Sequence, residues 1–256
     1  MNKKILLSLL PVFAGALSLS AQNFNYNFDG TDSDAFAVGD QLSSGVNIIA
    51  QNSWVIGDID GNGNLGAFTN GNYQRAVIFT PSEQTFNAGD TVTLNTRLRL
   101  ASQSAFTGEK PILRVGLRGS YTNNGTTDVG VEIFANSAFS FKINSADGST
   151  RQVLSPTNED FHDLSLAITK SETLNTFDVS AIWDENDAIN YTIVNSSLYS
   201  VDRVFATLGG RNNNAVGTTG IWLDSFSAST VPEPSTYASI FGLMALAFVV
   251  SRRKRG

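Results

Sequence analysis

Hydrophobic and polar residues alternate with a period of two through most of the chain. The segment TVTLNTRLRL (91–100) places five mostly apolar side chains on one face: Val92, Leu94, Thr96, Leu98 and Leu100. The segment ILRVGLRG (112–119) repeats the pattern, with Leu113, Val115 and Leu117 inside and Arg114 and Arg118 outside. Such alternation predicts β-strands with one buried and one solvent-facing side. The same pattern predicts further strands at 129–134, 138–144, 163–169, 176–183, 190–194, 204–210 and 221–229.

Clusters of Gly, Asn, Asp, Ser and Thr separate these strands. Examples are NAGD (87–90), TNNGTTD (122–128) and NSADGS (144–149). Such residues tolerate positive φ or cap turns, and one strand with its turn takes roughly 8 to 14 residues. No convincing helical spacing occurs between the two ends of the chain. We therefore predict one all-β domain over residues 22–230, an antiparallel two-sheet jelly-roll sandwich of about twelve strands.

The first 21 residues predict a secretory signal peptide. Two lysines precede an apolar stretch, Ile5–Leu17, and small residues follow that suit cleavage near Ser20 or Ala21. The alternative, a first buried helix, would need polar positions at helical spacing, but only Ser8 is polar within the apolar stretch.

Residues 231–256 predict a second membrane signal. A transmembrane helix is expected over 237–251, where the 14 residues 237–250 are free of charge. These residues span about 21 Å as a helix, less than the roughly 30 Å hydrocarbon core, but long flanking side chains can reach the headgroups. A basic tail, 252–255, should stop transfer and stay in the cytoplasm: Arg252, Arg253, Lys254 and Arg255. The alternative, a buried core helix, is disfavoured by apolarity on all sides.

The order of motifs in this tail resembles the PEP-CTERM sorting signal of exported Gram-negative bacterial proteins. The sequence VPEPST (231–236) precedes the apolar segment, and the four basic residues follow it. The resemblance implies that Pro232, Glu233 and Pro234 are recognised by an exosortase, a membrane protease that removes the anchor. It also implies passage through the secretion translocon, a transient inner-membrane anchor, and delivery to the cell surface or extracellular matrix. Two prolines keep such a strip extended and unpaired, which suits a protease cleft.

The body of the chain bears a second resemblance. The opening FNYNFDG (24–30), the meander from Phe161 to Ile193 and the late strand GIWLDSFSAS (220–229) resemble the concanavalin A-like, or laminin G-like, jelly roll of exported bacterial proteins. Many such domains are similar to carbohydrate-binding modules, some are similar to glycosidases, and others have no known ligand. The resemblance therefore implies a fold but does not select one function.

Charge and composition exclude several classes of function. Of the 17 Lys and Arg, two lie in the signal peptide and four in the basic tail, so 11 remain against 23 Asp and Glu, and residues 22–234 carry about −12. Nucleic acid and anionic membrane surfaces are poor partners for such a chain. With no Cys and a single histidine, His162, the sequence excludes disulfides, thiol catalysis and multi-histidine metal sites.

The segment DIDGNGNLG (58–66) is a candidate calcium loop. Three oxygen-bearing side chains match positions 1, 3 and 5 of the EF-hand pattern, and Asn64 at position 7 could offer a carbonyl: Asp58, Asp60 and Asn62. Thr69 falls at position 12, where a bidentate carboxylate is needed, and the flanks read as strands. An EF-hand is thus disfavoured, and a different loop-based Ca²⁺ site and a solvated turn remain open.

Carboxylates and His162 give little support to catalysis. Sugar hydrolysis needs two carboxyl groups held about 5 to 10 Å apart in one cleft, whereas Glu132 stands alone in its strand and residues 184–187 are expected in a hairpin turn. The cluster at 159–163 pairs His162 with Asp160 in sequence, and we interpret it as a solvated strand entry rather than a catalytic dyad. We predict no enzymatic activity and no catalytic residues.

Tryptophan side chains are candidates for stacking on sugar rings. Trp183 alternates in phase with Phe177 and Val179, which predicts a core position. Trp54 and Trp222 remain as candidate glycan-stacking residues, although a core position is the alternative for each.

The sequence favours an exported β-sandwich protein with a structural or adhesive role in an exopolysaccharide layer at the cell surface or in the extracellular matrix. A carbohydrate-binding module, assisted by Ca²⁺ if the 58–64 loop binds it, is the alternative, and a polysaccharide-active hydrolase is third. The expected partners are the translocon, the exosortase and polysaccharide, with membrane contact through the C-terminal helix before processing.

Overall fold

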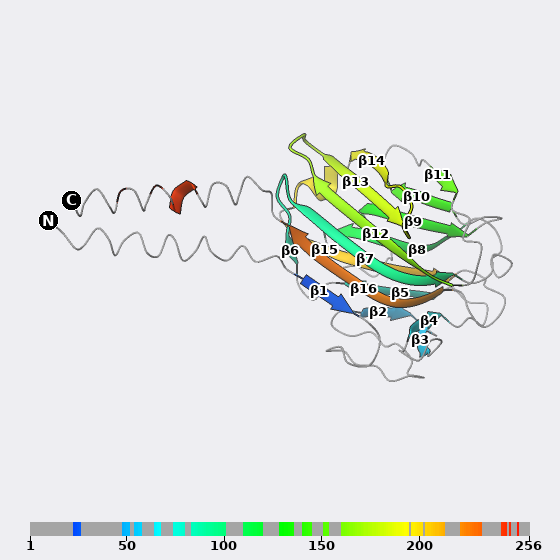
Figure 1. The fold of residues 1–256 in the computed structure, drawn as a ribbon. Coiled ribbons are helices and arrows are strands. Elements are labelled where there is room, and N and C mark those ends of the chain that lie inside the picture. The colour runs from blue at the N-terminus through cyan, green and yellow to red at the C-terminus, as the bar shows by residue number, and fades with distance from the viewer. Residues whose placement is uncertain are drawn as a thin grey trace, which may run out of the picture.

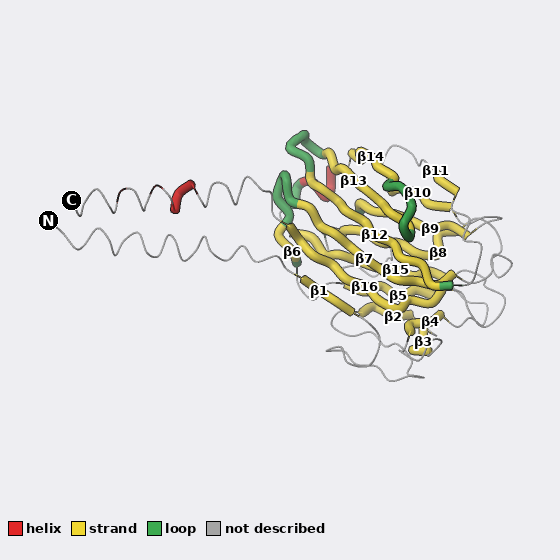
Figure 2. Tube along the Cα trace, viewed as in Figure 1, coloured by secondary structure: helices red, strands yellow, loops and turns green. Residues whose placement is uncertain are grey.

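The computed structural model describes residues 23–26, 48–51, 54–57, 64–67, 74–79, 83–100, 110–119, 128–135, 140–144, 151–153, 160–194, 196–201, 203–212 and 221–231, together with 242–244, 246 and 250. Strands dominate these ranges, as Figures 1 and 2 show.

Two antiparallel sheets lie face to face. In sheet A the strands run in the order β14 (Ile189–Val194), β13 (Thr176–Trp183), β12 (Phe161–Lys170), β7 (Thr91–Leu100), β16 (Ile221–Val231), β4 (Asn64–Ala67) and β3 (Trp54–Gly57), with β1 (Asn23–Tyr26) also paired to β16. In sheet B the order is β11 (Arg151–Val153), β10 (Ser140–Asn144), β9 (Val129–Ala135), β8 (Lys110–Arg118), β15 (Arg203–Asn212), β5 (Gln74–Phe79) and β2 (Ile48–Gln51), with β6 (Gln84–Thr85) paired to β15.

Strand pairing joins parts of the chain that are far apart in sequence. The first strand, β1, pairs with the last, β16, with Phe24 opposite Ala228. Strand β7 lies between β12 and β16, so residues 91–100 sit at the centre of sheet A. Figure 1 shows the first strand, β1, beside the last strand, β16. The beginning and the end of the sandwich are therefore fixed on the same sheet.

The core lies between the sheets and is filled from alternating strand positions. Leu94 and Leu98 of β7 and Leu113 and Leu117 of β8 are completely buried. Phe86 stacks on Phe177 with ring centroids 6.1 Å apart. Burial of large apolar side chains contributes about 1.5 to 3 kcal/mol each, which stabilises a chain without disulfides.

The sequence predicted several strands closely. Strands β7 and β13 occupy the expected residues 91–100 and 176–183, and the apolar positions of the predicted strand at 112–119 face the core. The prediction of an antiparallel β-sandwich is confirmed. The count of about twelve strands was too low, because the described residues hold sixteen. Strands β3 and β4 were expected only as the flanks of the 58–66 segment, and five strands were not predicted individually: β1, β2, β5, β6 and β11.

The prediction that Arg114 and Arg118 face solvent was wrong. Both side chains point away from sheet A, as the alternation requires, but the two residues are only 9% and 3% exposed. Alternation identifies the face that a side chain occupies, but it does not show whether that face is covered. The outward side of sheet B is therefore buried at these positions.

A buried lysine closes one end of the sandwich. Lys170, the last residue of β12, is 4% exposed, and its ammonium group donates hydrogen bonds to the carbonyls of Phe86 and Val201 at 3.1 and 2.9 Å. Its Nζ also lies 4.9 Å from the ring centroid of Tyr199, which belongs to the short helix α2 (Ser196–Tyr199). Hydrogen bonds and the aromatic face together compensate for removing the charge from water.

The two predicted targeting segments fall mostly outside the described residues. This applies to the whole signal peptide, 1–21, and to the VPEP motif and basic tail at Pro232, Glu233, Pro234 and Arg252–Arg255. Within 237–251, residues 242–244, 246 and 250 are helical, and the apolar Leu243 and Leu246 are 59% and 60% exposed. In the described part of the chain, no helix has both the length and the apolarity needed to span a membrane.

Candidate functional site

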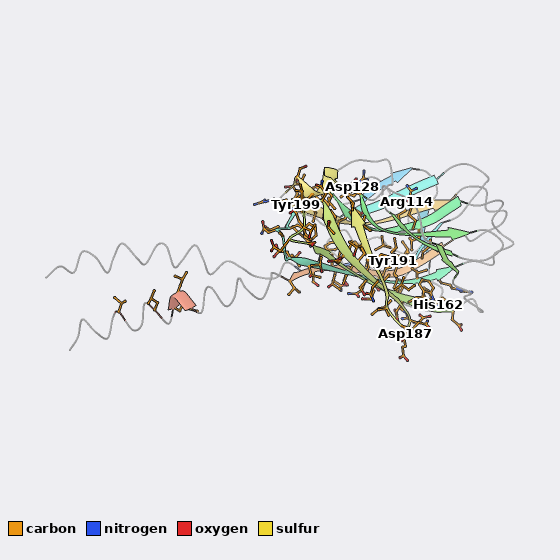
Figure 3. All side chains as sticks on the ribbon, turned by 90° about the horizontal axis from the view of Figure 1, so that it is seen from above. Arg114, Asp128, His162, Asp187, Tyr191 and Tyr199 are labelled. Carbon is orange, nitrogen blue, oxygen red and sulfur yellow. The ribbon has the colours of Figure 1, made fainter. Side chains whose placement is uncertain are left out.

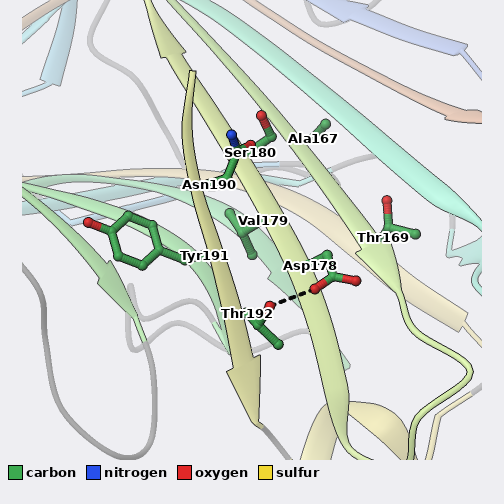
Figure 4. Close-up of a pocket in the computed structure, with 8 residues that line it drawn as sticks. All are labelled: Ala167, Thr169, Asp178, Val179, Ser180, Asn190, Tyr191 and Thr192. Carbon is green, nitrogen blue, oxygen red and sulfur yellow. Dashed lines mark hydrogen bonds between the residues drawn. The ribbon is translucent and has the colours of Figure 1, made fainter. Parts of the chain in front are cut away.

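An open groove lies on the face of sheet A that points away from the core. Strands β12, β13 and β14 supply its walls, and its volume is about 360 Å³ (Figure 4). The outward side chains are small or polar: Ala167 and Thr169 from β12, Asp178 and Ser180 from β13, and Asn190 and Thr192 from β14. We call these six residues the outer groove. Tyr191 also borders it but turns its ring toward the other side of the sheet, where it packs against the core (Figure 4).

The strand register arranges the outer groove in two rows that cross the strands. In the first row Thr169 is opposite Asp178, which is opposite Thr192. In the second row Ala167 is opposite Ser180, which is opposite Asn190. The two rows are two residues apart on each strand, or about 6.6 Å. The arrangement follows directly from period-two alternation, because every second side chain on a strand faces the same way.

Hydrogen bonds hold the first row in place. The Thr192 hydroxyl donates to Oδ1 of Asp178 at 2.8 Å, and the hydroxyls of Thr91 and Thr169 lie 2.8 Å apart, which extends the row onto β7. A carboxylate accepts at both oxygens, and each hydroxyl has capacity beyond one bond. The side chains of the first row are thus held in fixed orientations, and they keep further hydrogen-bonding capacity for a polar ligand.

Acidic residues outnumber basic ones in the three strands that form the outer groove and in their connecting turns. Residues 160–194, all described, contain seven Asp and Glu but one Lys and no Arg. That lysine, Lys170, is buried and directed toward the core side. Asp178 is exposed within the groove itself. The outer groove therefore presents hydroxyl and amide groups together with one carboxylate, that of Asp178.

A different kind of polar cluster is buried on the outward face of sheet B. Arg114 of β8 is opposite Glu132 of β9, with 2.7 Å between Nε and Oε1. Arg118 lies further along β8, and Asp128 accepts a hydrogen bond from the Gly119 amide at 2.9 Å. Figure 3 labels Arg114 and Asp128 on this sheet. Opposite charges within the cluster compensate for the burial of each.

Burial changes the pKa of one member of this cluster, Arg118. Desolvation lowers the pKa of Arg118, the Asp128 carboxylate opposes this by raising it, and the like charge of Arg114 lowers it further. Guanidinium groups remain protonated near neutral pH even when their pKa is lowered. The cluster accordingly consists of charged groups that bind one another, in contrast with the open outer groove.

His162 takes part in a third polar arrangement, but not the one considered from sequence. The residue is 9% exposed rather than solvated, and its Nδ1 lies 2.9 Å from Oδ2 of Asp184. Asp160, its neighbour in sequence, is exposed. The imidazole stacks on Trp183 with ring centroids 5.1 Å apart, and Nε2 is buried without a hydrogen-bond partner among the described residues. The interpretation of residues 159–163 as a solvated strand entry was therefore wrong for His162.

Asp184 links the start of β12 to the end of β13 through hydrogen bonds. Besides the contact with His162, its Oδ1 accepts a hydrogen bond from the Asp163 amide at 2.9 Å, and its own amide donates to the Asp163 carbonyl at 2.7 Å. Its φ of 51° is left-handed, a conformation that Asp adopts more readily than most residues. Nucleophilic catalysis would need a hydroxyl or thiol near Nε2, and among the described residues no such hydrogen bond exists. The geometry supports a structural role for the pair.

Solved structures share this fold. Peanut lectin is similar with a TM-score of 0.53 and 12% identity, over 83% of this chain and 98% of the lectin. Arcelin-5, a lectin-like defence protein from Phaseolus vulgaris, gives 0.52 and 13% over 83% and 99%. A carbohydrate esterase of the Shiga toxin-encoding bacteriophage phi24B gives 0.53 and 10% over 82% and 99%. No protein-family model matches the sequence, and no curated protein matches it. The chain thus has the lectin-like, concanavalin A-like jelly-roll fold that its body resembles.

The structure tests few of the site residues considered from sequence. Trp183 is 5% exposed, which confirms its core position. For Trp54 and Trp222 the structure defines only the backbone, in β3 and β16, and the register places Trp222 opposite Arg99. Both remain candidate stacking residues.

The candidate calcium loop lies between two paired strands. Gly57 at the end of β3 is opposite Asn64 at the start of β4, so the flanks are strands, as expected from sequence. Asp58, Asp60 and Asn62 lie outside the described residues. Among the described residues, no group of three or more His, Cys, Asp or Glu could hold a metal ion. The 58–64 loop therefore remains a prediction.

Sequence reasoning missed the outer groove. The alternation in 163–169, 176–183 and 190–194 already separated the polar positions from the core positions. The available signal for a groove was that the side chains at those outward positions are mostly small or polar rather than large and apolar. The strand order and register that bring them together required the structure.

Proposed function

We propose that this chain is an exported carbohydrate-binding protein whose ligand occupies the outer groove. The observation that carries the proposal is the groove itself, where hydroxyl, amide and carboxylate groups on three adjacent strands line one concave surface. Sugars present closely spaced hydroxyls, each both donor and acceptor, so a site with interspersed donors and acceptors matches them. Rigid strands hold such groups at fixed spacing, which reduces the entropy lost on binding.

The similarity to solved structures supports this choice. Proteins named as a lectin, a lectin-like defence protein and a carbohydrate esterase share the fold over more than four fifths of this chain. Fold alone does not determine function, and the proposal rests on the outer groove rather than on the similarity. The two together favour glycan binding over a purely structural role.

Export and sorting complete the proposal. The signal peptide sends the domain out of the cytoplasm, the segment 237–251 holds it at the membrane, and the Pro232–Pro234 motif marks it for exosortase removal. Exposed apolar side chains on the described helical residues, Leu243 and Leu246, support an environment other than water for that segment. We propose that the released protein binds matrix polysaccharide without cleaving it, which would give an adhesive role in an exopolysaccharide layer.

Affinity electrophoresis in gels containing soluble polysaccharide tests the proposal. The exported protein should be retarded by at least one polysaccharide from a panel of neutral and acidic polymers. The double variant Asp178→Ala with Asn190→Ala removes two exposed groove groups, and we expect it to lose at least tenfold in affinity, because each lost hydrogen bond costs about 0.5 to 3 kcal/mol.

A matched control removes two exposed polar residues outside the outer groove. Glu185→Ala with Asp187→Ala changes the turn after β13, where Asp187 projects away from the sheets (Figure 3). This variant should bind like the wild type. No retardation in any gel, or equal losses in both double variants, would contradict the proposed site.

A further inference from the structure

We infer that the outer groove binds an uncharged oligosaccharide chain that lies across the strands, and that it discriminates against polysaccharides rich in uronic acids. The inference deepens the proposed function and rests on it. Two independent observations carry it: the sign of the charges around the outer groove, and the direction in which its polar groups are aligned.

The charges oppose an acidic ligand. Asp178 is the ionisable group within the outer groove, and its carboxylate is exposed. A uronate bound beside it would bring two negative charges within a few ångströms of each other, and water only partly screens such a pair. Lys170 cannot compensate, because it is buried and bonded to the carbonyls of Phe86 and Val201.

The two outward-facing arginines of β7, Arg97 and Arg99, are too distant to compensate, and Arg99, opposite Phe161, is the farther of the two. Arg97 is opposite Asp163, four residues from Ala167 along β12, which corresponds to about 13 Å. Arg97 also has partners of its own, since its Nη1 lies 3.4 Å from Oδ2 of Asp224 and its guanidinium lies over the ring of Phe161. A hydroxyl-rich ligand without charge avoids the repulsion while it keeps every hydrogen bond.

The alignment of polar groups favours a chain over a single sugar. The first row continues from Thr192 through Asp178 and Thr169 to Thr91, and neighbouring strands are about 4.8 Å apart, so the row spans roughly 14 Å. The second row runs parallel to it and ends at Asn190. One sugar ring is too small to reach all of these groups, whereas a short chain between the rows could bond to both.

Polar groups continue across the strands from Thr192 to Thr91 and along β12 to Ser165 and Asp163, but they stop along β13. On β13 the next outward residue after Ser180 is Ile182, which interrupts the polar run along the strand. At the other end of the rows, β14 is the edge of sheet A in the strand order of the described residues. A chain that runs along the rows can therefore leave the sheet at β14, so internal segments of a polymer are accepted as well as its ends.

Isothermal titration of the exported protein tests both parts of the inference. The probes are glucose, galactose and mannose, neutral hexasaccharides of the same three sugars, and a hexamer of galacturonic acid. We expect the best neutral hexasaccharide to bind at least tenfold tighter than its monosaccharide, and at least tenfold tighter than the galacturonate hexamer at low salt. The second difference should shrink as salt is added.

The variant Asp178→Asn tests the charge argument directly. It keeps an acceptor for the Thr192 hydroxyl but removes the negative charge. We expect the affinity for the galacturonate hexamer, relative to the affinity for the neutral hexasaccharide, to rise three- to tenfold. The control Asp187→Asn removes an acidic charge outside the outer groove and should leave this ratio unchanged.

The outcomes separate failure of the inference from failure of the proposed function. If no saccharide binds, the proposed function is wrong, and the inference is wrong with it. If the galacturonate hexamer binds as tightly as the best neutral hexasaccharide, or if a monosaccharide matches its hexamer, glycan binding stands but the inference is overturned.

Discussion

Arg114 and Glu132 form an ion pair between β8 and β9, with 2.7 Å between Nε and Oε1 and with 10% and 6% of their side-chain surfaces exposed. The pair lies on the outward face of sheet B, whereas the outward face of sheet A is open at the outer groove. The two faces of this sandwich therefore use polar residues differently: one binds its charges to each other, and the other leaves its hydroxyls and amides accessible.

Removal of Glu132 alone should destabilise the protein strongly. In Glu132→Ala the Arg114 guanidinium stays buried but loses the carboxylate that faces it from β9. We therefore expect the free energy of unfolding to fall by about 3 to 5 kcal/mol. The double variant Arg114→Met with Glu132→Leu removes both charges and keeps apolar volume, so it should recover most of the loss. Urea denaturation measures the free energy of unfolding of both variants. A double variant as unstable as the single one would contradict a pairwise interaction.

Gly116 and Gly119 should respond very differently to alanine. A Cβ on Gly116 would lie 2.2 Å from the Val129 carbonyl oxygen and 2.8 Å from Cα of Gly130, both backbone atoms of β9. A Cβ on Gly119 would meet side-chain atoms alone, the nearest being those of Val201 at 3.3 Å and Leu198 at 3.7 Å. We expect Gly116→Ala to cost about 3 kcal/mol and Gly119→Ala less than about 1 kcal/mol. Similar melting temperatures for the two variants would show that β8 and β9 are not so closely paired.

Asp184 should contribute through both of its carboxylate oxygens. Asp184→Ala removes the contacts with the His162 ring and the Asp163 amide, and it places alanine at a φ of 51°. We expect a loss of about 2 to 3 kcal/mol, or roughly 5 to 10 °C in melting temperature. Asp184→Asn keeps an acceptor oxygen and the tolerance for left-handed φ, so its loss should be smaller. Equal losses in the two variants would refute a hydrogen-bonding role for the side chain.

The strands that were predicted well are those in which apolar residues recur at every second position over a long stretch. In 163–169 and 176–183 every second residue is a core-facing apolar one, and a short turn, 171–175, forces these strands to pair. The short strands β2, β3 and β4 have four residues each, which is too few to establish a period. Their place in the sheets comes from tertiary pairing with β5 and β16.

The candidate site was harder to predict than the fold. Asp178 and Thr192 are polar positions in two separate strands, and their contact depends on the register set by the turn at 184–188. The burial of Arg114 and the contact of His162 with Asp184 depend on tertiary packing in the same way. Sequence patterns assign residues to faces, but packing decides which faces are covered and which residues meet.

The sorting proposal predicts a specific mature mass. Intact-mass analysis of the protein from its native host should show loss of about the first 20 residues and of the basic tail. Pro232→Ala with Pro234→Ala should leave the tail attached, because the extended recognition strip is altered. Retention of Arg252–Arg255 in the wild type would contradict exosortase removal and indicate a permanent anchor.

Nuclear magnetic resonance mapping of the isotope-labelled exported protein tests the central claim most directly, with the neutral hexasaccharide that binds best as the ligand. The account predicts that the largest shift changes fall on the backbone amides of 167–169, 178–180 and 190–192 and on the side-chain amide of Asn190. Large changes confined to the sheet B residues around Arg114 and Glu132, with the outer groove unchanged, would contradict it.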